Sequence, residues 1–96
     1  MVNTVIYYQK NKNESTEQAV SCVNKLIKQL EPLHIIKGVF LDSYVQSTEL
    51  MELLNSPLDL IDYIYFNRPV ENEFDKELIT QLKRAEQFEI IYYDNI

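Results

Sequence analysis

Glycine, cysteine and long apolar runs are scarce in this sequence. Gly38 is the one glycine among 96 residues. This excludes a glycine-rich phosphate loop, because such loops need glycine to let backbone N–H groups approach a phosphate. Cys22 is the one cysteine, so the chain can form neither an internal disulfide nor a cysteine-based metal cluster. The apolar runs fall far short of the about 20 residues that span a bilayer, and we expect no membrane association.

Positive charge is also scarce. The chain has two arginines, Arg68 and Arg84, no basic run, and a net charge of −6. Nucleic-acid binding draws much of its affinity from Lys and Arg that neutralise phosphates, so we expect no direct nucleic-acid binding by this acidic chain. The N-terminal residues lack a basic segment followed by an apolar stretch, which predicts a cytoplasmic protein without a signal peptide.

What is present is an alternation of strand-like and helix-like segments. Strands are expected at residues 2–8, 35–41, 61–66 and 89–93. Helices are expected at residues 16–30, 48–54 and 72–87. Ser15 and Gln18 match a capping box at the start of the first helix, and Ser47 or Thr48 is expected to cap the second.

This alternation indicates repeated βαβ units. We predict one α/β domain over residues 1–96, a three-layer sandwich with a mostly parallel four-stranded sheet and flavodoxin-like topology. Ligands of such sheets bind beyond the carboxyl ends of the strands. The loops at 9–13, 42–46 and 67–71 are therefore expected to converge at one edge.

These loops and the strands before them resemble the resolvase/invertase family of serine recombinases. Residues 6–11 (IYYQKN) are similar to the strand that ends in Tyr-x-Arg-x-Ser, residues 38–42 (GVFLD) to the second strand with its final aspartate, and residues 61–68 (IDYIYFNR) to the third, which ends in Leu-Asp-Arg-Leu-x-Arg. Order and spacing agree over nearly the entire chain. The resemblance implies a resolvase-like fold, in which a serine attacks a DNA phosphodiester and arginines stabilise the developing charge.

At the positions that carry this chemistry, the chain departs from the family. Asn11 stands at the nucleophilic serine and Gln9 at the first arginine. Asn67 and Arg68 stand at the Asp-Arg pair, and the last arginine of that loop falls at Glu71. Residues 46–49 after Asp42 carry no cation where the family usually has an arginine. One arginine of four remains, so we expect no enzymatic activity.

Other residues near this edge are better explained by structure. The nearby hydroxyls are those of Ser15, Thr16, Ser43 and Ser47. Ser15 and Ser47 are expected to be helix caps, and Ser43 to make a local turn hydrogen bond. His34 precedes the second strand, so we expect its side chain to lie far from the edge at which the three loops converge. The carboxylates of Glu71, Glu73 and Asp75 are explained by a favourable interaction with the dipole at the start of the third helix. We expect neither a metal nor a cofactor.

The sequence thus predicts a catalytically inactive resolvase-like domain that acts by binding a protein, either a recombinase or a second copy of itself, in DNA recombination or a mobile element. Val45, Val70 and Ile96 are candidate contacts. The alternative is a small-molecule or anion site at Asp42, Asn67 and Arg68. A receiver-type phosphorylation domain fits less well, because Asp42 is the one acidic residue in place for it.

The family continues past the fourth strand into a long dimer helix and a DNA-binding region, whereas this sequence ends at Ile96. The resemblance therefore implies that both are missing here. Two explanations stay open: a natural relic of the catalytic domain, or a piece of a longer recombinase.

Overall fold

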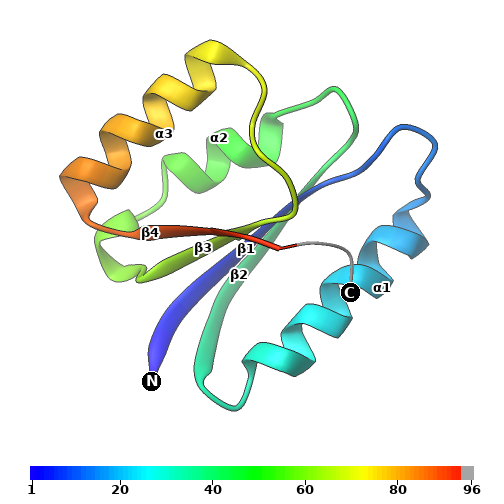
Figure 1. Cartoon of the computed structure of the whole chain (residues 1–96), viewed down its shortest axis with the longest axis horizontal. Helices are drawn as coiled ribbons and strands as arrows, with labels where there is room; N and C mark the ends of the chain where they lie inside the picture. The colour runs from blue at the N-terminus through cyan, green and yellow to red at the C-terminus, as the bar shows by residue number, and fades with distance from the viewer. Residues whose placement is uncertain (94–96) are drawn as a thin grey trace.

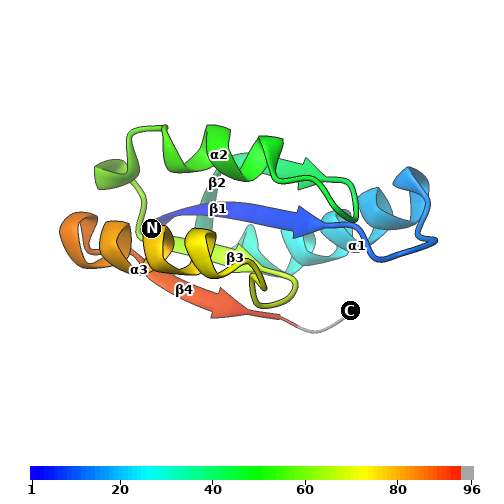
Figure 2. The same cartoon turned by 90° about the horizontal axis from the view of Figure 1, so that it is seen from above.

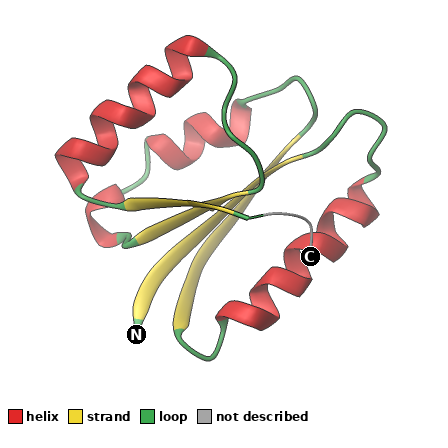
Figure 3. Cartoon of the chain, in the orientation of Figure 1, coloured by secondary structure: helices red, strands yellow, loops and turns green. Residues whose placement is uncertain are grey.

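The computed structural model describes residues 1–93 and confirms the predicted alternation of strands and helices (Figures 1 and 3). In chain order the elements are β1 (Val2–Gln9), α1 (Thr16–Leu30), β2 (His34–Asp42), α2 (Thr48–Leu54), the 3₁₀ turn η1 (Leu58–Leu60), β3 (Tyr63–Phe66), α3 (Glu73–Glu86) and β4 (Glu89–Tyr92). The strand predicted from residue 61 begins later, at Tyr63. The reason is that the Ile61 N–H closes the 3₁₀ turn by donating to the Leu58 carbonyl at 3.0 Å.

All four strands are parallel, in the order β2-β1-β3-β4. This is the flavodoxin-like order that the sequence predicted. Figure 2 shows the strands running in one direction toward the edge at which the loops after β1 and β2 emerge. The β1–β2 register shifts where Thr4 pairs with Ile36 and Val5 with Gly38, so Lys37 is the extra residue. A glycine inside a strand often marks such an irregularity.

Successive side chains of β1 enter different cores, because they point to opposite faces of the sheet. Val5 and Tyr7 pack with buried residues of α2 and α3, among them Leu53 and Ile79. The buried partners of Ile6 on the other face come from α1. In Figure 1, α2 and α3 lie on one side of the sheet and α1 on the other. The predicted three-layer sandwich is therefore confirmed.

Two of the helix starts follow from nearby residues. The Ser15 hydroxyl accepts from the Gln18 N–H at 3.1 Å, and the Gln18 side chain accepts from the Ser15 N–H at 2.9 Å, so the predicted capping box is present. Asn72 caps α3 by accepting from the Asp75 N–H at 2.9 Å. Between residues 1 and 93, no helix combines the length and the apolar character needed to cross a membrane.

Candidate functional site

Loops after β1, β2 and β3 are tied together at the carboxyl edge of the sheet. The Lys10 N–H donates to the Asp42 carbonyl at 2.9 Å, which extends the β1–β2 pairing by one step. The Gln9 side-chain amide donates to the Gln46 carbonyl at 3.0 Å. Asn67 in the β3–α3 loop bonds to the backbone of Gln9. The structure therefore brings Gln9, Asp42 and Asn67 together.

Asp42 is buried, with only 3% of its surface exposed, and its carboxylate is fully engaged. It accepts from the Tyr7 hydroxyl at 2.7 Å and from the backbone N–H groups of Glu49 and Leu50 at 2.9 and 3.0 Å. Asp42 therefore caps α2 from the end of β2. The expectation of a Ser47 or Thr48 cap is wrong: Ser47 stands at the cap position but makes no side-chain cap bond, because the aspartate already accepts those N–H groups.

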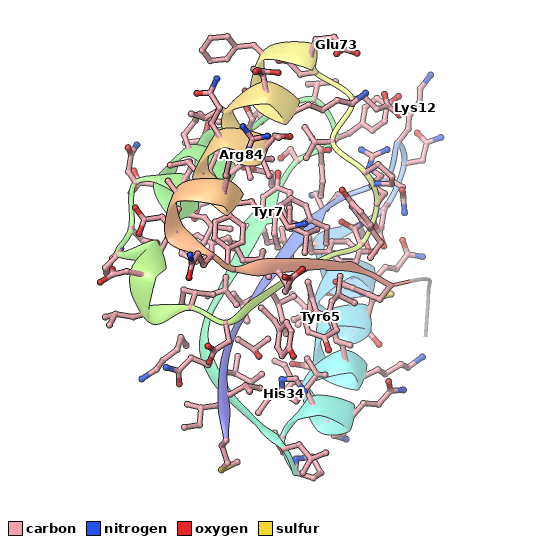
Figure 4. All side chains as sticks on the ribbon, turned by 60° about the vertical axis from the view of Figure 1, so that its left-hand side comes forward. Tyr7, Lys12, His34, Tyr65, Glu73 and Arg84 are labelled. Carbon is pink, nitrogen blue, oxygen red and sulfur yellow. The ribbon has the colours of Figure 1, made fainter. Side chains whose placement is uncertain are left out.

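The hydrogen bond to Asp42 affects the ionisation of Tyr7. Its ring is buried between the sheet and the α2–α3 layer, and Figure 4 shows it beneath α3. Burial, and secondly the hydrogen bond to Asp42, raise the pKa of the Tyr7 hydroxyl well above its ordinary value. Tyr7 therefore stays a neutral donor and helps to hold the carboxylate of Asp42 in place.

Asn67 is also held by structural hydrogen bonds. Its side-chain oxygen accepts from the Gln9 N–H and its side-chain nitrogen donates to the Gln9 carbonyl, both at 2.9 Å. An amide side chain can satisfy a donor and an acceptor of one residue at once. Asn67 thus continues the β1–β3 pairing beyond Phe66, and both ends of its amide are already occupied.

Arg68 lies at this edge with most of its hydrogen-bonding capacity unused by described residues. Its guanidinium makes one long hydrogen bond, from Nη2 to the Lys10 carbonyl at 3.4 Å, although the group has five N–H donors. Its Nε is buried and has no partner among residues 1–93. The Tyr44 ring covers the guanidinium, with 5.5 Å from Cζ to the ring centroid, in a cation–π contact. Several donors of Arg68 are therefore without a protein partner among residues 1–93.

A hollow of about 310 Å³ opens beside Arg68, and we call it the Arg68 hollow. It is lined by Tyr7, Gln9, Tyr44, Val45, Gln46, Ser47, Leu50, Arg68, Val70, Glu71, Asn72 and Asp75. The lining joins the β2–α2 loop, the β3–α3 loop and the first turn of α3. Arg68 is the cation of this set, and Glu71 and Asp75 are its carboxylates. The edge therefore has a concave, mixed-charge site, in which Asp42 and Asn67 are support rather than lining.

The positions that the resemblance assigns to recombinase chemistry separate in the structure. Gln9, Arg68 and Glu71 line the hollow. Asn11 does not line it: its backbone N–H and its side-chain amide both donate to Glu14 Oε1, at 2.9 and 3.4 Å. The short turn before α1 thus engages the asparagine locally.

Other residues singled out in the sequence lie elsewhere. The Thr16 hydroxyl accepts from Lys10 Nζ at 3.1 Å. Ser43 begins a turn, in which its carbonyl accepts from the Gln46 N–H at 3.2 Å. His34 starts β2 at the opposite end of the sheet, within 2.7 Å of the Thr4 hydroxyl. Figure 4 shows His34 and Lys12 at opposite ends of the molecule, so the predicted remoteness of the histidine is confirmed.

Sequence reasoning missed Tyr7, Tyr44 and Asp75 as residues of the site. The sequence explains Asp75 by the dipole of the third helix alone, and no local motif singles out Tyr7 or Tyr44. The spacing of Tyr7 along β1 indicates burial but does not reveal its hydroxyl partner 35 residues later. Within residues 1–93 no three His, Cys, Asp or Glu side chains are grouped as metal ligands would be.

The fold matches that of a known enzyme domain. The crystal structure of the C-terminal catalytic domain of ISC1926 TnpA, an IS607-like serine recombinase, superimposes with a TM-score of 0.76 over 98% of this chain and 72% of that chain, at 17% sequence identity. No protein-family model matches the sequence, and no curated protein matches it. The chain therefore has the resolvase-like α/β fold of a serine recombinase catalytic domain, as the resemblance of its three loops implied.

Proposed function

We propose that this chain is a recombination-related, resolvase-like domain that acts by reversible binding and not by covalent strand exchange. The observation that carries the proposal is Asn11. It stands where the resemblance places the nucleophilic serine, and its carboxamide lies 3.4 Å from Glu14 Oε1. An amide can donate a hydrogen bond but cannot form the phosphoserine ester that strand exchange requires.

The charges at the edge support the same proposal. Arg68 is the arginine that remains of the family's set, while Gln9 and Glu71 occupy two other arginine positions and line the same hollow. Loss of one charge-stabilising donor costs on the order of 100- to 1000-fold in rate. A carboxylate at Glu71 also repels a DNA phosphate, and the net charge of −6 adds to this repulsion.

Incubation with supercoiled plasmid, followed by denaturing electrophoresis, tests whether the chain cleaves DNA or bonds to it covalently. We expect neither nicked DNA nor a covalent protein–DNA adduct. Ser47 is the serine that lines the Arg68 hollow, and its side chain makes no cap bond, so Ser47→Ala is the matched variant. An adduct that forms with the unmodified chain and disappears in Ser47→Ala would overturn the proposal and identify a relocated nucleophile.

The Arg68 hollow at the edge of the sheet favours a small molecule as the ligand that is bound reversibly. A volume of about 310 Å³ is at the lower end of the roughly 300 to 1,000 Å³ typical of small-molecule sites. The sequence had suggested Asp42, Asn67 and Arg68 as ligand contacts. Because the side chains of Asp42 and Asn67 are engaged, we assign the ligand contact to Arg68.

A protein partner is the second candidate, and the exposed rim of the hollow favours it. Val45 is 82% exposed and Tyr44 is 44% exposed. Val70, also suggested as a contact, is half-buried against the α2–α3 core, and Ile96 lies outside the described residues. A pull-down from host lysate with Val45→Asp as the test variant and Leu33→Asp as the control checks this candidate, because Leu33 is 74% exposed but lies outside the hollow. Recovery of a serine recombinase that only Val45→Asp abolishes would support it, and equal recovery with both variants would argue against this rim.

A further inference from the structure

The Arg68 hollow holds opposite charges that do not pair with each other. Arg68 and Glu71 lie in the β3–α3 loop, and Asp75 lies in the first turn of α3. The ion pairs between described residues are Lys76–Glu73 at 3.3 Å and Lys83–Glu89 at 3.7 Å. Arg68 is therefore not neutralised by Glu71 or Asp75, although all three face one hollow.

Tyr7 shows that two of these charges act on the same point. Burial and the hydrogen bond to Asp42 are the main causes of its raised pKa. Arg68 and Asp75 add smaller, opposite contributions, with Arg68 lowering the pKa and Asp75 raising it. Both charges therefore act on the hydroxyl of Tyr7, which lines the same hollow.

A ligand with charge of one sign fits this arrangement poorly. An anion at Arg68 would face Glu71 and Asp75, and a cation at the two carboxylates would face Arg68. The amino end of α3 adds about half a positive charge, which does not offset two carboxylates. A ligand that carries both a carboxylate and an ammonium group meets a charge of opposite sign at each end.

We infer that the Arg68 hollow binds a small zwitterion of the α-amino acid class, with its carboxylate at Arg68 and its ammonium group toward Asp75 and Glu71. Arg68 suits a carboxylate because its planar fork of N–H donors matches the two oxygens. The Ser47 hydroxyl supplies a further polar contact, as does the side-chain oxygen of Gln9, whose nitrogen already donates to Gln46. Tyr44 and Val45 form an apolar rim for the ligand's side chain. This inference rests on the proposed function, in the form in which the hollow binds a small molecule.

Isothermal titration calorimetry with each of the twenty common amino acids tests the inference. For the tightest binder, the corresponding amine without its carboxylate and the corresponding acid without its amino group are titrated in parallel. We expect each half-ligand to bind at least about tenfold more weakly, since one charge-assisted interaction contributes at least that factor. Circular dichroism confirms that every variant used is folded.

Matched variants assign the two ends of the ligand. Arg68→Gln and Asp75→Asn are each expected to weaken amino-acid binding at least about tenfold. Arg84→Gln and Glu52→Gln remove the same charges from exposed sites outside the hollow, and we expect them to leave the affinity unchanged. In the Arg68→Gln variant the amine should keep its weak affinity, because Arg68 contacts only the carboxylate.

The outcomes separate the inference from the function on which it rests. If the acid alone binds as tightly as the amino acid and Asp75→Asn strengthens binding, the site takes simple anions. If the amine alone binds as tightly, the site takes cations. Either result overturns the zwitterion inference and leaves the hollow as a ligand site. If no amino acid or half-ligand binds the folded protein, both the inference and the ligand arm of the proposed function are overturned.

Discussion

Replacement of Asp42 is the most direct test of how the edge is built. The carboxylate joins β1 to α2 through the Tyr7 hydroxyl and the N–H groups of Glu49 and Leu50, at 2.7, 2.9 and 3.0 Å. Alanine would leave all three donors without an acceptor in a buried place. Asparagine keeps the shape of the side chain, but its nitrogen cannot accept. With its oxygen toward Tyr7 and Leu50, the nitrogen meets the Glu49 N–H, donor against donor.

The size of the effect follows from these contacts. Removal of one partner from a buried donor costs about 1–3 kcal/mol, and loss of a helix cap costs about 1 kcal/mol. Because the three bonds share one carboxylate, their contributions do not add fully. We expect Asp42→Ala to lower the free energy of unfolding by about 4 kcal/mol and Asp42→Asn by about 2 kcal/mol. A domain of this size has a total of about 5–15 kcal/mol, so the alanine variant should lose roughly a quarter or more of its stability.

Urea unfolding at neutral pH, followed by circular dichroism, measures both values. Asp59→Asn is the matched control, because Asp59 lies exposed in η1, and it should change stability by less than about 0.5 kcal/mol. A double-mutant cycle with Tyr7→Phe should give a coupling free energy of about 1–2 kcal/mol. If Asp42→Asn unfolds at the same urea concentration as the unmodified chain, Asp42 does not support α2 as described.

Further perturbations test other parts of the fold. Asn67→Ala removes both bonds to Gln9 and should lower the free energy of unfolding by about 1–2 kcal/mol. Asn67→Asp should cost a similar amount, because a carboxylate cannot donate to the Gln9 carbonyl. If urea unfolding shows that Asn67→Asp is as stable as the unmodified chain, that result would argue against the bond. Leu53→Ala should cost about 2–5 kcal/mol in the same assay, since Leu53 is fully buried, and a loss below about 1 kcal/mol would contradict its place in the core. Burial, followed by hydrogen bonds to Asp42 and Glu14, raises the pKa of Tyr7 and of Tyr8 in the fold, whereas an unfolded tyrosine ionises near pH 10. Stability should therefore hold below about pH 10 and decrease above it by up to about 1.4 kcal/mol per pH unit for each tyrosine; urea unfolding across this range should show a smaller slope for Tyr8→Phe, and an unchanged slope would refute the assignment.

The helix starts illustrate which features are readable from local sequence. The capping box at α1 involves Ser15 and Gln18, three residues apart, so the sequence pattern contains both partners. At α2 the local pattern suggested Ser47 or Thr48, but the cap comes from Asp42, at the end of the preceding strand. A residue outside the helix can cap it once the fold brings its carboxylate to the N–H groups, and no local pattern predicts this.

The ligand candidates show the same limit. Asp42, Asn67 and Arg68 have equal standing in the sequence, as polar residues at strand ends. In the structure, two of them are engaged by Tyr7 and Gln9, at separations of 35 and 58 residues. Arg68 differs because its guanidinium makes only one long hydrogen bond to a described residue, to the Lys10 carbonyl, and otherwise contacts the face of the Tyr44 ring.

The sequence by itself determined the strands, the helices, the parallel topology and the resemblance to a serine recombinase scaffold, because these depend on side-chain periodicity and on local motifs. It also determined that Asn11 cannot act as a serine nucleophile, since that depends on residue type alone. The tertiary structure alone decided that Asp42 and Asn67 are support, that Tyr44 covers Arg68, and that Asp75 faces the same hollow. The reason is that the role of a polar side chain is set by its hydrogen-bond partners, and those partners come from distant parts of the chain.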